Sequence, residues 1–215
     1  MLKVVDLTGS RPRVTTHCFG PERSEHAVAV ELRLEPDARS GLRLLMEMSA
    51  RQPWPDGERV FWRLPIVATD QLAASQLLAA HQLLEASLVG NGPVPLLVDD
   101  YLQVFDGAAG GQLTVEIQSL GWSVRSALPY KRLVAVVFAP VELAYDEYLA
   151  VALGLQARLP KGAPFKAGMI HRPLQQPMLF LLGQRSQGQR PIGEGCRDRA
   201  PDGLESGVAC LFLKS

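Results

Sequence analysis

The sequence has few of the features that normally reveal a compartment or a membrane association. Among its 215 residues are only three cysteines, Cys18, Cys196 and Cys210, too few and too scattered for a disulfide framework. A reducing compartment is therefore expected, and the predicted location is cytoplasmic. No run approaches the roughly 18 apolar residues that a membrane span requires. The N-terminus has no apolar leader segment, so we expect neither a signal peptide nor a membrane span.

An excess of either charge is also missing, because 22 lysines and arginines balance 22 aspartates and glutamates. A chain without net charge has no general attraction for nucleic acid or for an anionic membrane. Aromatic residues are only 7% of the chain, and they do not alternate with basic residues as they do in RNA-binding sheets. The sequence therefore predicts no nucleic-acid partner.

Motifs for catalysis or cofactor binding are absent as well. The chain has no complete phosphate-binding glycine loop, no Gly-x-Ser-x-Gly, no His-Glu-x-x-His and no paired Cys-x-x-Cys. His17, Cys18, Cys196 and Cys210 are of the right chemical type for zinc, but no two of them have the short spacing that zinc sites use. We expect no cofactor and no metal site.

The pattern of hydrophobic residues, in contrast, predicts the secondary structure of the chain. Short apolar or alternating runs predict strands at residues 2–7, 14–19, 26–34, 59–64, 96–105, 112–120, 122–128, 133–138, 178–182 and 208–213. The run at residues 133–138 is apolar without interruption, which is typical of a central strand covered on both faces.

Apolar residues at helical spacing predict three helices. They cover residues 38–51, the segment from about residue 70 to Gly90, and residues 142–158. The second of these has the clearest stop signal, a glycine at its end and a proline soon after.

The order of these elements is not a strict alternation of strand and helix. It predicts a single α+β domain over residues 1–215, with a mixed or mainly antiparallel sheet and about three helices. Residues 183–207 are rich in glycine, arginine, glutamine and serine, and we expect a long polar loop there.

The most basic short stretch of the chain contains Lys161, Lys166, His171 and Arg172. Cationic and imidazole side chains of this kind suit an anion or an acidic protein surface. We therefore predict that these four residues bind a partner.

Other reactive side chains are scattered. Cys196 has two arginines nearby that would lower its thiol pKa. Asp99 and Asp100 are adjacent at a predicted strand start, where they would point in opposite directions. His17 and Cys18 are expected to diverge for the same reason, and His81, on the apolar stripe of a helix, is expected in the core or at an interface.

The leading hypothesis is a non-catalytic protein-interaction module: an adaptor, an assembly accessory or an inhibitor-like partner of another protein. The alternative is a small hydrolase or transferase with a site assembled from distant Cys, His and Asp residues. There, Cys196 or the Asp99–Asp100 pair would work with His171 as acid or base. A second alternative is a subunit of an oligomeric assembly, in which the chain pairs with its own copies.

Overall fold

The computed structural model describes residues 1–18, 28–38, 41–51, 59–68, 73–90, 92–106, 108, 111–120, 128 and 130–185. The described strands are β1 (Leu2–Asp6), β2 (Arg13–His17), β3 (Val28–Asp37), β4 (Gly41–Arg51), β5 (Arg59–Ala68), β6 (Leu113–Ser119), β7 (Tyr130–Ala139), β8 (Phe165–His171) and β9 (Met178–Arg185). The described helices are α1 (Ala73–Val89), α2 (Val98–Phe105) and α3 (Tyr145–Gln156).

All nine described strands belong to one mixed sheet, in the order β2-β1-β3-β4-β5-β6-β9-β7-β8. Three neighbouring pairs are parallel: β1 with β3, β5 with β6, and β7 with β8. The remaining pairs are antiparallel. The α+β class with a mixed sheet and three helices is thus confirmed for the described part of the chain.

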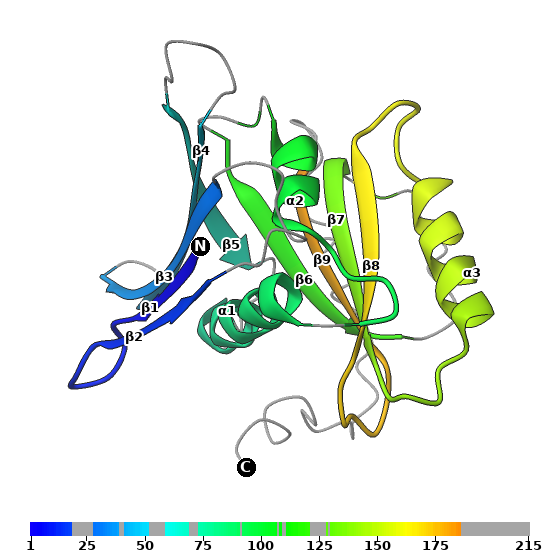
Figure 1. Ribbon diagram of the computed structural model, residues 1–215, viewed down its shortest axis with the longest axis horizontal. Coiled ribbons are helices and arrows are strands. Elements are labelled where there is room, and N and C mark those ends of the chain that lie inside the picture. Colours follow the sequence, from blue (N-terminus) through cyan, green and yellow to red (C-terminus); the bar gives the residue numbers. More distant parts are fainter. Residues whose placement is uncertain are drawn as a thin grey trace, which may run out of the picture.

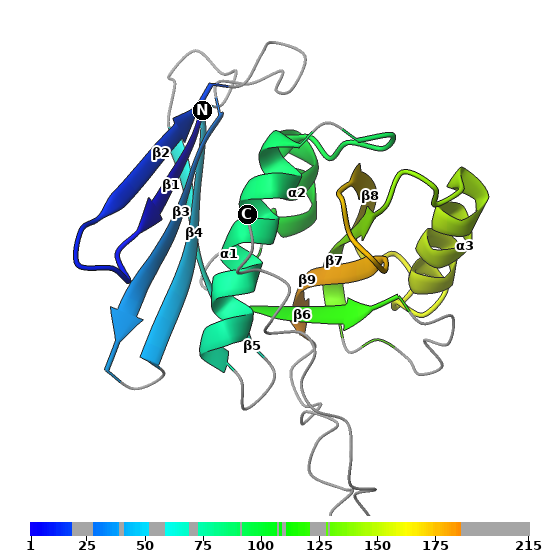
Figure 2. The same ribbon diagram turned by 90° about the horizontal axis from the view of Figure 1, so that it is seen from below.

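The sheet curls so that its two halves lie on opposite sides of α1 and α2 (Figures 1 and 2). We call β2, β1, β3, β4 and β5 the first half-sheet, and β6, β9, β7 and β8 the second. Helix α1 contacts β3, β4 and β5 of the first and β6 of the second, whereas α2 contacts β7 and β8. Helix α3 lies on the outer flank, where it contacts β8.

Two hydrophobic cores result from this layering. The larger lies between the half-sheets and contains the apolar residues of α1 and α2. The smaller lies between the second half-sheet and α3. Strand β7 contributes to both, because Val134 and Val136 face the first core while Leu133 and Ala135 face the second. The prediction of a central strand covered on both faces is therefore confirmed.

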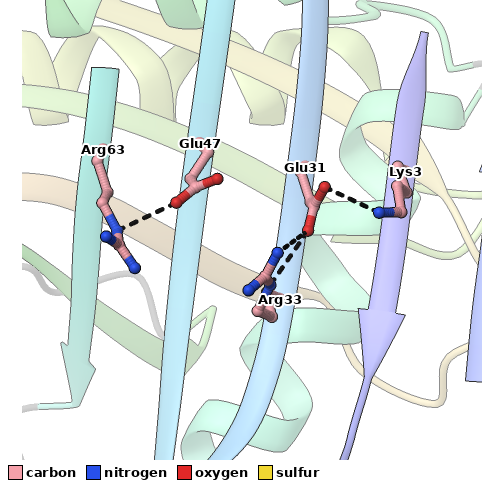
Figure 3. A network of polar contacts seen from close by, with 5 residues as sticks. All are labelled: Lys3, Glu31, Arg33, Glu47 and Arg63. Atoms are coloured by element: carbon pink, nitrogen blue, oxygen red, sulfur yellow. Dashed lines mark hydrogen bonds and ion pairs between the residues drawn. The ribbon is translucent and has the colours of Figure 1, made fainter. Parts of the chain in front are cut away.

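The outer face of the first half-sheet is charged (Figure 3). Glu31 accepts hydrogen bonds from Lys3 Nζ at 3.1 Å and from Arg33, and the Nε atom of Arg63 lies 3.0 Å from Glu47 Oε1. Burial alone would raise the pKa of Glu31, but the hydrogen bonds from Arg33 and Lys3 hold that pKa below its ordinary value. These charges are therefore paired with one another, within β3 and between neighbouring strands.

The predicted helix at residues 38–51 is wrong, because this segment forms strand β4. Its residues Leu44, Met46 and Met48 are buried against the core and alternate with outward-facing positions. Leu45, on the outer face, is also buried and gives the segment its helical spacing. Pairing with β3 and β5 on both sides overrides the modest helix propensity of leucine and methionine.

The predicted strand at residues 96–105 is also wrong, because its main part forms helix α2. Val98, Tyr101, Val104 and Phe105 are all buried, and their spacing places them on one face of a helix. Asp100 lies in the first turn, where its Oδ2 atom accepts a hydrogen bond from the Leu97 amide at 2.8 Å. Satisfying a free amide in this way favours the start of a helix.

The remaining predicted segments differ from the structure in their bounds or lie outside the described residues. Residues 165–171, to which no element is assigned from the sequence, form β8, and β9 extends through Arg185. The remainder of the predicted loop at 183–207, the predicted strand at 208–213 and nearly all of that at 122–128 lie outside the described residues. No helix in the described ranges has the length and apolar character needed to cross a bilayer.

Candidate functional site

The four residues predicted to bind a partner are distributed along β8. Lys161 lies in the turn before the strand, and Lys166 lies within it. His171 and Arg172 lie at its far end, and seven strand residues extend about 23 Å. The structure therefore brings His171 and Arg172 together and keeps Lys161 apart from them.

Lys166 is already engaged within the fold. Its Nζ atom lies 2.7 Å from Asp100 Oδ1, so the ion pair joins β8 to the first turn of α2. The other carboxylate oxygen of Asp100 caps that helix. Asp99 and Asp100 thus occupy a helix start, where negative charge is favourable, instead of the predicted strand.

His171 and Arg172 line an open pocket of about 530 Å³, which we call the histidine pocket. His17 at the end of β2 and Glu85 on α1 line the same pocket, and His17 Nε2 lies 2.9 Å from Glu85 Oε1. A carboxylate in this position fixes the orientation of the imidazole ring. Glu85 was not among the predicted residues, because 68 positions separate it from His17.

The chemistry of the histidine pocket is mixed. Arg172 can hold an anion, and the His17–Glu85 pair is a hydrogen-bonded imidazole and carboxylate of the kind used in general acid–base catalysis. A second pocket of about 540 Å³ adjoins it and shares His171 and Arg172. No three His, Cys, Asp or Glu side chains within the described ranges are grouped closely enough to hold a metal ion.

His81 and Cys18 are not among the described residues that line this pocket. His81 is buried on α1, in agreement with the expected core position, and burial lowers its pKa so that the neutral form is favoured. Cys18 is exposed and directly follows His17. Cys196 and Cys210 lie outside the described residues.

A different surface carries exposed apolar side chains, and we call it the α3 face. It consists of Val141, Tyr145, Leu149 and Leu153, whose exposed fractions are 72%, 56%, 39% and 56%. The last three are spaced four residues apart on α3, so they form one stripe along the helix. Single exposed apolar residues are ordinary, but a contiguous apolar patch is typical of an interaction site.

The amino-acid sequence itself carries a signal for this surface, although it is not a motif. Residues 148–157 contain no aspartate, glutamate, lysine or arginine. One face of α3 packs on the second core through Tyr148 and Leu155. The opposite face would ordinarily carry charged residues in a helix at the surface of a protein, but here it carries leucines and alanines.

Comparisons with known proteins identify no family: no family model and no curated protein match the chain. Among solved structures it is similar to two of FtsZ from M. jannaschii, both 15% identical to it. A mutant FtsZ gives a TM-score of 0.42 over 52% of this chain and 38% of that chain. The empty FtsZ dimer gives 0.40 over 52% and 39%. The match thus spans less than two-fifths of FtsZ, and a likeness at this level carries no argument about function.

Proposed function

We propose that this chain is a non-catalytic protein-interaction module, such as an adaptor, an assembly accessory or an inhibitor-like partner, and that the α3 face is its contact surface. The observation that supports the proposal is the uncharged stripe of Tyr145, Leu149 and Leu153 at the surface. Fully burying a leucine side chain contributes about 1.5–3 kcal/mol. A tyrosine at the end of such a stripe is a typical anchor of protein interfaces.

The test compares two leucines with nearly equal exposure. Leu149 on the α3 face is 39% exposed, and Leu78 on α1 is 40% exposed. We expect Leu149→Glu to abolish stoichiometric co-purification of the partner, because an unpaired carboxylate would enter an apolar contact. The matched variant Leu78→Glu should retain the partner. If both variants retain it at the wild-type ratio, the α3 face is not the contact surface.

A small hydrolase or transferase is the second candidate, and the histidine pocket favours it. His17 with Glu85 would act as the acid–base pair, and Arg172 would hold an anionic group of the substrate. This candidate predicts that an anionic metabolite raises the unfolding temperature of the wild type in a thermal-shift screen. The same metabolite should not stabilise Arg172→Ala, whereas equal stabilisation of both proteins would exclude the pocket as its site.

A further inference from the structure

Helices α1 and α3 are both rich in apolar residues, but of these two only α1 lies between two layers of the described fold. Helix α1 lies between the half-sheets, and Leu77, Leu83, Leu84 and Leu88 are all buried there. Helix α3 lies on the outer flank, where β8 and its neighbours cover one side alone (Figures 1 and 2). A helix with apolar residues on both its inner and outer faces is typically a buried one, so the uncharged stretch of α3 at residues 148–157 favours a second covering surface.

Opposite charges flank the stripe at its two ends. Glu142 and Asp146 lie at the N-terminal end of α3, and Arg158 and Lys161 follow its C-terminal end. None of these four side chains forms an ion pair with another described residue. Ten residues without charge, 148–157, separate the two charged ends, which corresponds to about 15 Å along the helix axis.

We propose that a second copy of this chain covers the α3 face, with the two α3 helices antiparallel across a two-fold axis. The proposal rests on the α3 face being a contact surface, as argued above. The antiparallel arrangement places the acidic end of each helix against the basic end of the other. A two-fold axis uses the same patch on both copies, so the patch must complement itself, and acidic and basic ends on one helix meet that requirement.

The apolar stripe also complements itself in this arrangement. An axis near Val151 places Leu149 of each copy beside Leu153 of the other, and Tyr145 beside Ala157 of the other. The large tyrosine therefore meets a small residue, and the leucines meet leucines. A standard protein interface buries about 1,600 Å², and a pair of short helices buries less than that. We therefore expect a dimer whose dissociation constant lies in the micromolar range.

The first experiment measures the oligomeric state of the full chain. Sedimentation velocity from about 1 to about 100 µM should show a reversible monomer–dimer equilibrium. Leu149→Glu should weaken dimerisation by about 100-fold because it places two carboxylates in the apolar seam, and Leu78→Glu should leave it unchanged. A wild-type protein that stays monomeric throughout, or a Leu149→Glu protein that dimerises normally, would overturn the proposal.

The second experiment tests the antiparallel charges with two double variants. One carries Glu142→Lys with Asp146→Lys, and the other carries Arg158→Glu with Lys161→Glu. Each alone should dimerise at least 10-fold more weakly, because like charges meet at both ends of the seam. An equimolar mixture should regain dimers, since every end then meets the opposite charge. Combining all four reversals in one chain should restore self-association.

The mixture separates the dimer from effects inside a single helix. Acids near a helix N-terminus and bases near its C-terminus also stabilise an isolated helix through its dipole. That contribution is lost in each double variant and is not recovered on mixing. Mixtures that remain monomeric while both variants are folded by circular dichroism would overturn the antiparallel pairing.

The outcomes also distinguish this proposal from the proposed function. A monomeric wild type whose other binding partner is lost in Leu149→Glu would exclude the second copy and leave the interaction module intact. A chain in which Leu149→Glu changes neither self-association nor partner binding would overturn both.

Discussion

The buried hydrogen bond between α1 and α2 allows an asymmetric prediction of stability. Ser87 Oγ and the Tyr101 hydroxyl lie 2.6 Å apart, and both residues are fully buried. Ser87 Oγ also lies 2.8 Å from the carbonyl oxygen of Leu84, to which it donates. Because serine has a single hydroxyl proton, Tyr101 must donate to Ser87. The serine is thus the acceptor that the tyrosine needs inside an apolar core.

Removing either partner should therefore have different costs. Ser87→Ala leaves the Tyr101 hydroxyl without an acceptor, which should lower the free energy of unfolding by about 1–3 kcal/mol. Tyr101→Phe removes the donor and leaves Ser87 bonded to Leu84, so we expect a loss of about 0.5–1.5 kcal/mol. For a chain of this length each kcal/mol shifts the melting temperature by about 2–4 °C.

The double variant isolates the interaction itself. With both changes no unpaired hydroxyl remains, so the total loss should be close to that of Tyr101→Phe alone. Urea unfolding of the four proteins, followed by circular dichroism, should give a coupling free energy close to the Ser87→Ala loss, about 1–3 kcal/mol. Losses that add within about 0.3 kcal/mol, or a Tyr101→Phe protein less stable than Ser87→Ala, would refute the assigned direction of the bond.

Two further predictions concern strand packing and alkaline pH. Gly183→Ala should lower stability by at least about 2 kcal/mol, because the new Cβ would lie 2.5 Å from Tyr130 Cδ1 and 2.6 Å from the Arg132 carbonyl oxygen; a melting temperature equal to that of the wild type would contradict this close packing. Burial raises the pKa of Tyr101 and Tyr130 above the ordinary 10.0. Above about pH 10 the folded state keeps tyrosine protons that the unfolded state loses, so the free energy of unfolding should be constant up to about pH 10 and fall above it. The fall should be less steep in Tyr101→Phe than in the wild type. Parallel pH profiles of the two proteins would rule out a contribution from Tyr101.

The elements predicted correctly carry their signal within a few neighbouring residues. Helix α1 combines leucines at helical spacing with a stop at Gly90, and it begins and ends close to the predicted positions. Strand β7 has an unbroken apolar run, which suits a strand packed on both faces. These patterns express the local geometry of helix and strand, so they can be recognised without knowledge of the fold.

The segments that form β4 and α2 were assigned to the wrong type of element for the same reason: their apolar patterns fit both a helix and a strand. In β4, buried Leu45 adds an apolar residue on the outer face, and in α2, Asp99 and Asp100 were assigned to a strand start. In both segments the pattern within the chain was compatible with helix and strand. Strands β3 and β5 on either side of β4, and the core beneath α2, decided between them.

The candidate functional residues also separate into those that the sequence alone can indicate and those that depend on the tertiary structure. The sequence alone identifies His171 and Arg172 as part of a basic stretch, and it also shows that residues 148–157 carry no charge. Only the tertiary structure brought His17 beside Glu85 and engaged Lys166 with Asp100. It also left one side of α3 uncovered while enclosing α1 on both. Local propensity and residue chemistry are properties of short segments, whereas burial and long-range contacts depend on how distant segments pack together.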